Sequence, residues 1–296
     1  MAAQSNIVLL GKIGQLGWEL NRDLQPLGKV TALDYPQIDF TRPAELISLL
    51  ESLQPELIVN AVAYTNVDKA ESEPELCDQI NFHAVEQLAR LASHLGCGLI
   101  HVSTDYVFDG SQSRPYTEED PTNPVNHYGR SKLAGEQEVL TKAPACWVLR
   151  TAWLYSRRAN DFVHRVLTWS RQQETLKIVE DQVGSPTWAR LLSQMISLAL
   201  AKSNGRFFDY LEKTRGVYHL AGDGSASRLE WVQKILELDP EREEQKTRQV
   251  LPASTADFPT PAQRPLFTAL DCSRFYRTFG LRLPRWDEAL KLAMER

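Results

Sequence analysis

Two hydrophobic patterns alternate along the first half of the chain. Up to about residue 155, short apolar runs bounded by turn residues are separated by stretches in which apolar residues recur every three or four positions. The short runs are typical of strands buried on both faces, and the longer pattern is typical of amphipathic helices. The predicted strands are 6–11, 29–34, 56–63, 98–104 and 146–155. The predicted helices are 15–26, 43–54, 73–95 and 127–142. This βαβαβαβαβ order predicts an α/β fold with a Rossmann-type, doubly wound parallel sheet.

Beyond residue 160 the pattern becomes less regular. The predicted elements there are helices near 160–173, 189–202 and 227–237 and a strand at 216–221. A proline-rich tract from Pro252 to Pro265 follows, and Phe258 within it indicates an ordered loop that packs on the protein. We expect a sheet domain over residues 1–170 and a smaller, mixed α/β second domain over 171–296, with some segments able to interleave.

Composition narrows the classes of function. The 296 residues are 43% hydrophobic, which is enough for two domain cores. The net charge of −5 and the lack of a basic block argue against a nucleic-acid partner. No apolar run approaches the roughly 18 residues of a membrane span, and no positively charged leader precedes the first apolar run. The four cysteines are scattered without metal-ligand or disulfide spacing, so we expect free thiols, no intrinsic metal and a cytoplasmic location.

A glycine-rich turn follows the first predicted strand. Gly11, Gly14 and Gly17 open the first predicted helix with the spacing G-x-x-G-x-x-G, one residue longer than the usual dinucleotide fingerprint. Glycine allows a pyrophosphate to approach the backbone, and the helix amino terminus offers free N–H groups. We therefore expect a bound dinucleotide.

Acidic residues near the second strand bear on the choice of cofactor. Asp34 ends that strand, where a carboxylate accepts hydrogen bonds from the adenosine ribose. An acid there favours NADH because it repels a 2′-phosphate, whereas Lys12 in the glycine turn offsets its charge, so NADPH and NADH both stay open. Asp39 and Phe40 are candidates for adenine contacts by hydrogen bonding and stacking, although the same segment also has the pattern of a helix start.

A tyrosine and a lysine four positions apart are the candidate catalysts. Tyr128 and Lys132 fall on one face of a predicted helix, so the ammonium group lies near the phenol. A neighbouring positive charge lowers a tyrosine pKa from its ordinary value near ~10 and makes the phenol a tuned acid. Ser103, Thr104 and Asp105 follow the fourth strand at the carboxyl edge of the sheet, where a group that holds a carbonyl oxygen is expected.

With these residues in place, the chain resembles the extended short-chain dehydrogenase/reductases and, within them, the dTDP-4-dehydrorhamnose reductases. The resemblance spans nearly the whole chain. Its stretches are Gly11-x-x-Gly14-Gln15-Leu16-Gly17, NAVAYTNVDKAESEPE (60–75), STDYVFDG (103–110), YGRSKLAGE (128–136), RTAWLY (150–155), DQVGSPT (181–187) and PTPAQRP (259–265). Two departures are Val62, where alanine is common, and Ala152, where serine is common; neither removes a reacting group.

The resemblance implies a role for each matched residue. Tyr128 is the expected proton donor, Lys132 tunes it and holds the nicotinamide ribose, and Thr104 hydrogen-bonds the sugar carbonyl. Residues expected at the cofactor are Gly11, Gly14, Gln15, Leu16, Asp34, Asp39, Phe40, Ala63, Tyr64, Thr65, Val102, Tyr128 and Lys132. Residues expected at the substrate, a dTDP-sugar bound mainly by the second domain, are Thr104, Asp105 and Trp153. Members of this family commonly use NADPH and some accept NADH. Some relatives bind Mg²⁺ at a dimer contact, which leaves a homodimer and this ion as open expectations.

Two alternatives share much of this pattern. The regulatory subunit of methionine adenosyltransferase resembles the same family, keeps a Y-x-x-x-K and binds nucleotide without catalysis; the tryptophan at Trp153 favours the reductases. Nucleotide-sugar epimerases and dehydratases also share the pair. Dehydratases usually carry an acid pair after the strand-end threonine, but here Asp105 is followed by Tyr106. His101 is expected to be a satisfied core residue or a group behind the site rather than a metal ligand.

Overall fold

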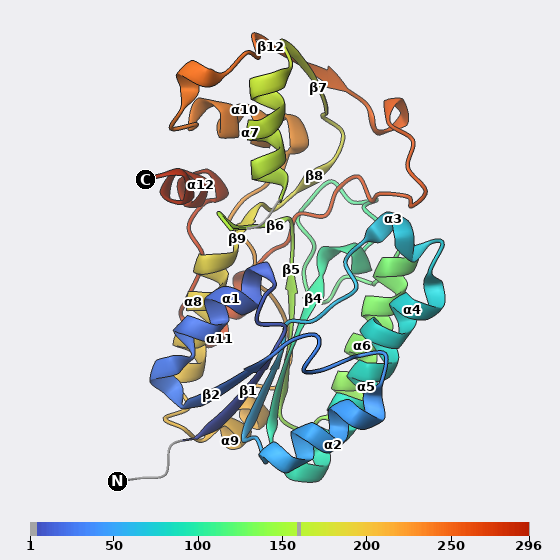
Figure 1. Cartoon of the computed structure of the whole chain (residues 1–296), viewed down its shortest axis with the longest axis vertical. Coiled ribbons are helices and arrows are strands. Elements are labelled where there is room, and N and C mark those ends of the chain that lie inside the picture. The colour runs from blue at the N-terminus through green and yellow to red at the C-terminus, as the bar shows by residue number, and fades with distance from the viewer. Residues whose placement is uncertain (1–4, 159–160, 296) are drawn as a thin grey trace.

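The structure is a computed structural model that describes residues 5–158 and 161–295 (Figure 1). A six-stranded sheet forms its centre, in the order β10-β5-β4-β3-β1-β2. The strands are β1 (Asn6–Leu10), β2 (Lys29–Leu33), β3 (Leu57–Asn60), β4 (Gly98–Thr104), β5 (Cys146–Thr151) and β10 (Gly216–His219). All neighbouring pairs are parallel. Because β2 and β3 lie on opposite sides of β1, the order in which strands are added across the sheet reverses there, and a crevice opens beyond the carboxyl ends of the strands.

Helices cover both faces of this sheet (Figure 1). On one face lie α1 (Gln15–Asp23), α8 (Ala189–Ala201), α9 (Phe207–Lys213) and α11 (Ser273–Phe279). On the other lie α2 (Pro43–Leu53), α3 (Val67–Ala70), α4 (Pro74–Asp78), α5 (Ala84–Leu95) and α6 (His127–Lys142). Successive residues of β1 point to opposite faces, so Ile7 and Leu9 pack towards α1 and α8, whereas Val8 and Leu10 pack towards α2 and α5.

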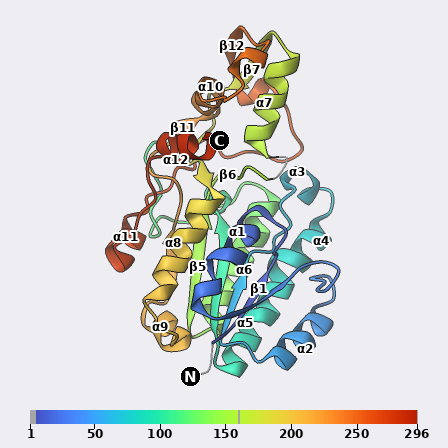
Figure 2. The same cartoon turned by 60° about the vertical axis from the view of Figure 1, so that its left-hand side comes forward.

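The second part of the molecule lies beyond the carboxyl edge of the sheet (Figures 1 and 2). Its helices are α7 (Phe162–Gln172), α10 (Arg228–Glu237) and α12 (Trp286–Met294). Its strands pair as β7 (Thr175–Val179) with β12 (Gln249–Ala253), β8 (Val183–Gly184) with β11 (Ala226–Ser227), and β6 (Leu154–Tyr155) with β9 (Thr187–Trp188). An aromatic core that includes Tyr155, Trp188, Trp231 and Trp286 holds these pieces together.

The two parts of the molecule share chain segments. The strand predicted at 216–221 forms β10, which pairs with β5 at the edge of the main sheet. The helix predicted at 189–202 is α8, which packs against α1 on the same sheet. A single cut at residue 170 therefore does not separate the two parts, because α8, α9 and β10 all lie beyond it in the chain and return to the sheet.

Most predicted elements are present, with corrections at their ends. The predicted strand 146–155 is wrong as one element, because β5 ends at Thr151 and Trp153 adopts a left-handed backbone (φ 42°) before β6 begins. The predicted helix 73–95 contains α4, a π-helix (Gln79–His83) and α5 in succession. The predicted helix 15–26 ends at Asp23 and continues as a 3-10 turn. The predicted start of the next helix at residue 160 lies outside the described residues, and α7 begins at Phe162 with Asp161 as its cap.

The proline-rich tract is ordered against the sheet domain. Arg264 forms an ion pair with Asp68 (2.8 Å), and the side chain of Asn126 donates to the carbonyl of Gln263 (2.9 Å). Asn126 also caps α6 by accepting from the N–H of Gly129 (2.8 Å), so the tract contacts the start of the helix that carries Tyr128. In the part of the chain that the structure describes, none of the helices has the length and apolar character to cross a membrane.

Candidate active site

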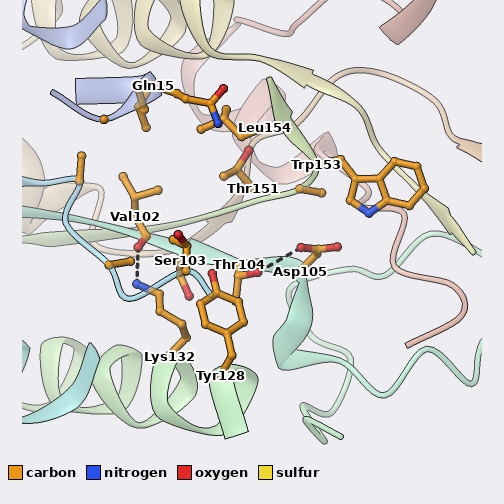
Figure 3. Close-up of a pocket in the computed structure, with 16 residues that line it drawn as sticks. Gln15, Val102, Ser103, Thr104, Asp105, Tyr128, Lys132, Thr151, Trp153 and Leu154 are labelled. Carbon is orange, nitrogen blue, oxygen red and sulfur yellow. Dashed lines mark hydrogen bonds between the residues drawn. The ribbon is translucent and has the colours of Figure 1, made fainter. Parts of the chain in front are cut away.

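A cavity of about 390 Å³ opens at the carboxyl ends of β3, β4 and β5, facing the start of α1 (Figure 3). Its lining residues are Gly14, Gln15, Leu16, Ala61, Ala63, Thr65, Val102, Ser103, Thr104, Asp105, Tyr128, Lys132, Thr151, Ala152, Trp153 and Leu154. Parallel sheets present ligands at this edge. The structure thus brings the predicted catalytic residues and most of the predicted cofactor residues together.

The glycine turn forms one wall of the cavity. Gly11 has a left-handed backbone (φ 93°), and a Cβ on Gly17 would lie 1.8 Å from the carbonyl oxygen of Gly11. Side chains are therefore excluded where the turn packs on itself. Gly14 caps α1 without a side-chain hydrogen bond, and no acidic residue occupies the first turn. The free N–H groups and the positive end of the helix dipole suit a pyrophosphate.

Five predicted cofactor residues do not line this cavity: Gly11, Asp34, Asp39, Phe40 and Tyr64. Asp34 lies beside the glycine turn, where its carboxylate accepts from the N–H groups of Ile13 (2.9 Å) and Tyr35 (2.8 Å). Asp39 accepts from the N–H of Thr41 (2.8 Å), so it closes the turn before α2.

The remaining two side chains of these five are held by neighbouring residues. Phe40 is 5% exposed and packs in the core with Leu46 and Leu50, so its ring is not free to stack on an adenine. Tyr64 donates its hydroxyl to Glu73 (2.5 Å).

Helix α6 directs Tyr128 and Lys132 into the cavity side by side (Figure 3). The phenol ring packs edge-on against Tyr106 (5.9 Å between centroids). Lys132 is 1% exposed, and its Nζ donates to the carbonyl of Val102 (2.7 Å) and lies 3.2 Å from Nε2 of His101. The spacing predicted from the sequence thus places both groups on one wall, opposite the glycine turn.

The pKa shifts of this pair differ from the expectation. Burial raises the pKa of Tyr128, and a hydrogen bond with Thr104 acts in the opposite direction without cancelling it. Burial also lowers the pKa of Lys132 to about 8. The predicted lowering of the tyrosine pKa is therefore wrong for this arrangement, in which desolvation is the largest cause of the shift. A raised pKa keeps the phenol protonated, as a proton donor requires.

Thr104 and Asp105 form a hydrogen-bonded unit beside the phenol. The hydroxyl of Thr104 donates to Asp105 (3.1 Å), and the hydroxyl of Thr268 donates to the other oxygen of the same carboxylate (2.5 Å). Asp105 is 3% exposed, and burial raises its pKa to about 6. A buried carboxylate with a raised pKa at the mouth of a cleft is a feature of functional sites.

Trp153 closes the cavity on the side of the second part of the molecule. Its ring stacks on Trp231 (5.5 Å) and lies so close to Gly184 that a Cβ there would meet the indole at 2.4 Å. The guanidinium of Arg228 lies 3.5 Å from the centre of the Trp153 ring. Desolvation lowers the pKa of Arg228 to about 10. No local sequence pattern pointed to Arg228, because only the fold brings the start of α10 over Trp153, which lines the cavity.

Three further polar atoms of the cavity are free to form hydrogen bonds with a ligand. Gln15 Oε1, Ser103 Oγ and Thr151 Oγ1 are buried and have no hydrogen-bond partner within the described part of the chain. Buried polar atoms without partners are rare in native proteins, and here they lie where a ligand would satisfy them. Together with the glycine turn, they fit a polar dinucleotide. Among the described residues, no group of three or more His, Cys, Asp or Glu side chains is arranged to hold a metal ion.

The sheet, the glycine turn and the Tyr128–Lys132 pair facing it define an extended short-chain dehydrogenase/reductase. The family described as "RmlD substrate binding domain" matches residues 5–296. The chain is 38% identical to dTDP-4-dehydrorhamnose reductase from Salmonella typhimurium, covering 97% of this chain and 96% of that protein. The chain belongs to the dTDP-4-dehydrorhamnose reductase family of oxidoreductases.

Two further similarities bear on ligands. A crystal structure of dTDP-4-dehydrorhamnose reductase from Bacillus anthracis, in complex with NADP, superimposes with a TM-score of 0.87 at 31% identity over 98% of both chains. A protein of Streptomyces antibioticus, named a probable dTDP-4,6-dihydroxy-2-methyloxan-3-one 4-ketoreductase, is 37% identical over 97% of this chain and 93% of its own length. The family thus includes proteins named for different 4-keto sugars.

Proposed function

We propose that the chain reduces the C4 keto group of dTDP-4-dehydro-L-rhamnose to dTDP-L-rhamnose with NADPH or NADH. The observation that carries this proposal is the placement of Thr104, Tyr128 and Lys132 on one wall of the cavity, with the glycine turn opposite. The family supports the choice of reaction, since the matched proteins from Salmonella typhimurium and Escherichia coli are named for this reduction.

The cofactor would lie along the wall formed by Gly14, Gln15 and Leu16, with its pyrophosphate at the amino terminus of α1. When bound, it supplies the hydride for the sugar carbonyl. Lys132 would hold the nicotinamide ribose, since it is directed into the cavity beside Val102. The protein's own contribution is orientation and one placed acid.

Tyr128 would give its proton to the C4 oxygen of the sugar. Its raised pKa keeps the hydroxyl protonated at neutral pH, and the Thr104 hydroxyl lies beside it. For Thr104 to donate to the sugar oxygen, its proton must turn away from Asp105, to which it is now directed. The carboxylate of Asp105 would then be free to accept a sugar hydroxyl.

The nucleotide end of the substrate would extend towards the second part of the molecule. Arg228 lies over Trp153 and also lines a neighbouring pocket of about 250 Å³ with Phe162, Trp169 and Phe258. A guanidinium directed at such a cavity suits a diphosphate, and the aromatic rings suit a base. We infer that Arg228 contacts the substrate diphosphate.

Two groups at the glycine turn bear on whether the cofactor carries a 2′-phosphate. Asp34 already accepts two backbone N–H groups, yet a carboxylate has lone pairs left for ribose hydroxyls. Lys12, whose Nζ donates to Gln37 (2.7 Å), adds a positive charge that suits a 2′-phosphate. We propose that both NADPH and NADH are used.

The decisive experiment incubates the purified protein with dTDP-4-keto-6-deoxy-L-mannose and either NADPH or NADH, and identifies the sugar product. The proposal expects stoichiometric oxidation of the nicotinamide and formation of dTDP-L-rhamnose. Tyr128→Phe should lower kcat about 10²-fold or more with an intact fold. A protein that binds dinucleotide but oxidises none of it with this sugar would support a binding subunit, and turnover without net oxidation would support an epimerase or dehydratase.

A second substrate distinguishes close relatives within the family. The same assay with a dTDP-4-keto sugar that lacks the C2 hydroxyl tests the activity named for the Streptomyces antibioticus protein. If that sugar is reduced with the higher kcat/KM, the assignment to the rhamnose precursor is wrong while the reductase class stands.

A further inference from the structure

His101 lies in the middle of β4, directly behind the catalytic lysine. It is 1% exposed and does not line the cavity. Both ring nitrogens nevertheless have a polar neighbour: Nδ1 lies 3.1 Å from the amide nitrogen of Asn60, and Nε2 lies 3.2 Å from Nζ of Lys132. The imidazole therefore connects the end of β3 to the lysine.

A backbone group sets the direction of these hydrogen bonds. The N–H of Val62 donates to the side-chain oxygen of Asn60 (3.1 Å), and a backbone N–H can only donate. The oxygen of Asn60 is thus engaged, and its NH₂ group faces His101. Rotating the amide by half a turn would place two donors together at Val62. Nδ1 of His101 must therefore accept, and the proton of the neutral ring lies on Nε2.

This direction continues to the lysine. The Nε2–H of His101 points at Nζ of Lys132, which also donates to the carbonyl of Val102 (2.7 Å). A neutral amine has a lone pair that accepts from His101, whereas an ammonium group only donates. When the lysine is neutral, each donor between the Val62 N–H and the Val102 carbonyl has an acceptor. When the lysine is charged, its ammonium group and the Nε2–H of His101 are two donors that face each other in the buried interior.

Other ionisable groups around Lys132 do not reverse this preference. Tyr128 and Glu136 project from the same helix, Cys77 comes from α4, and Arg150 from β5 holds Glu136 in a buried ion pair (2.7 Å). No acid pairs directly with Lys132 in the described residues. Burial lowers the pKa of Lys132 to about 8, which is the direction that the hydrogen bonds favour. Burial, together with the charge on Lys132, holds the pKa of His101 well below its usual range, so the ring is neutral.

We propose that His101 is a positioning residue for Lys132: with Asn60 it forms a hydrogen-bond chain of fixed direction, and this chain favours the neutral amine of the lysine. The inference rests on the role of Lys132 in the proposed function. The negative charge that Tyr128 acquires on donating its proton acts in the opposite direction and favours the ammonium form of the lysine.

Asn60→Asp reverses the direction of this hydrogen-bond chain with little change in the shape of the side chain. A carboxylate accepts from both the Val62 N–H and the ring, which moves the imidazole proton to Nδ1 and turns Nε2 into an acceptor for an ammonium group. The expected result is a rise in the Lys132 pKa of about one unit or more. The matched control is Asn6→Asp, which adds the same charge at the opposite end of the sheet, where Asn6 begins β1.

Nuclear magnetic resonance on the full-length protein reads both groups without a substrate. Histidine labelled with ¹⁵N reports which ring nitrogen of His101 carries the proton, and lysine labelled at Cε reports the titration of Lys132. Spectra of His101→Gln and Lys132→Met identify the two signals. The proposal expects Nε2–H in the wild-type protein and Nδ1–H in Asn60→Asp.

Two results would overturn the proposal. One is a wild-type ring protonated on Nδ1, which needs no variant and so stands even if Asn60→Asp fails to fold. The other is a folded Asn60→Asp protein whose Lys132 titrates as in the wild type. Because neither readout depends on turnover, a failed reductase assay would sink the proposed function and leave this inference intact. In the active enzyme, the alkaline limb of the kcat profile should move upward with the lysine pKa, a shift that loss of structure alone does not produce.

Discussion

Replacing Asp105 with asparagine should make the protein more stable in a way that depends on pH. The carboxyl group is 3% exposed, and its pKa is raised from 3.8 to about 6 chiefly by burial. The folded protein therefore binds this proton more tightly than the unfolded chain does. Between the two pKa values the unfolded chain ionises first, so wild-type stability falls as pH rises from about 4 to about 6.

The size of the effect follows from the shift. Each pKa unit corresponds to about 1.4 kcal/mol, so the gap from 3.8 to about 6 corresponds to about 3 kcal/mol. The amide introduced by Asp105→Asn does not titrate, so the variant escapes this loss. Its stability relative to the wild type should increase by about 3 kcal/mol between acid and mildly alkaline pH, apart from a constant offset from changed hydrogen bonds with Thr104 and Thr268.

Urea unfolding of both proteins across this pH range measures the difference. The control is Asp109→Asn, because hydrogen bonds, chiefly from the backbone of Ser111, lower the pKa of Asp109 to about 2. The stability that Asp109 contributes is present above 3.8 and is lost as pH falls through about 2, so this variant should be less stable at neutral pH. The stability difference between Asp105→Asn and the wild type could instead stay constant with pH. That result would show that ionising the buried carboxyl group does not destabilise the folded protein by about 3 kcal/mol.

Three more predictions concern the site and its support. Gly17→Ala places a methyl group 1.8 Å from the carbonyl oxygen of Gly11, so the glycine turn must shift. The affinity for the dinucleotide, measured by calorimetry, should therefore fall at least about 10-fold. An unchanged affinity would contradict the packing argument. Arg228→Met should raise the KM for the dTDP-sugar about 10-fold or more in steady-state assays, because a hydrogen bond to a charged group contributes ~1.5–3 kcal/mol. The KM for NADPH should stay near the wild-type value. Glu136→Gln breaks a buried ion pair with Arg150 and should destabilise the fold by about 3–5 kcal/mol in thermal unfolding; a loss below about 1 kcal/mol would refute the role of that pair.

The homodimer, the Mg²⁺ ion and the exact division of the domains stay predictions. The first two depend on a partner surface, which a single chain does not reveal. Analytical ultracentrifugation with and without Mg²⁺ tests both together.

The local pattern of the sequence determined much of the sheet domain. Buried strands, amphipathic helices and a glycine turn are each encoded within a few neighbouring residues, and the four-residue spacing of Tyr128 and Lys132 places both on one helix face wherever that helix packs. The position of Thr104 at a strand end also follows from local order, because all parallel strands of a sheet open at the same edge.

Tertiary structure decided what depends on distant segments. β10 joins the main sheet although the sequence around it follows a second-domain pattern, because edge pairing with β5 is a long-range choice. Phe40 was predicted at the adenine but is buried in the core, since local sequence does not reveal which apolar side chains the fold covers. Only the fold brings Arg228 over Trp153 and His101 behind Lys132. The pKa of Tyr128 is raised rather than lowered for the same reason: desolvation depends on everything that surrounds a group in space, whereas sequence spacing reports a single neighbour.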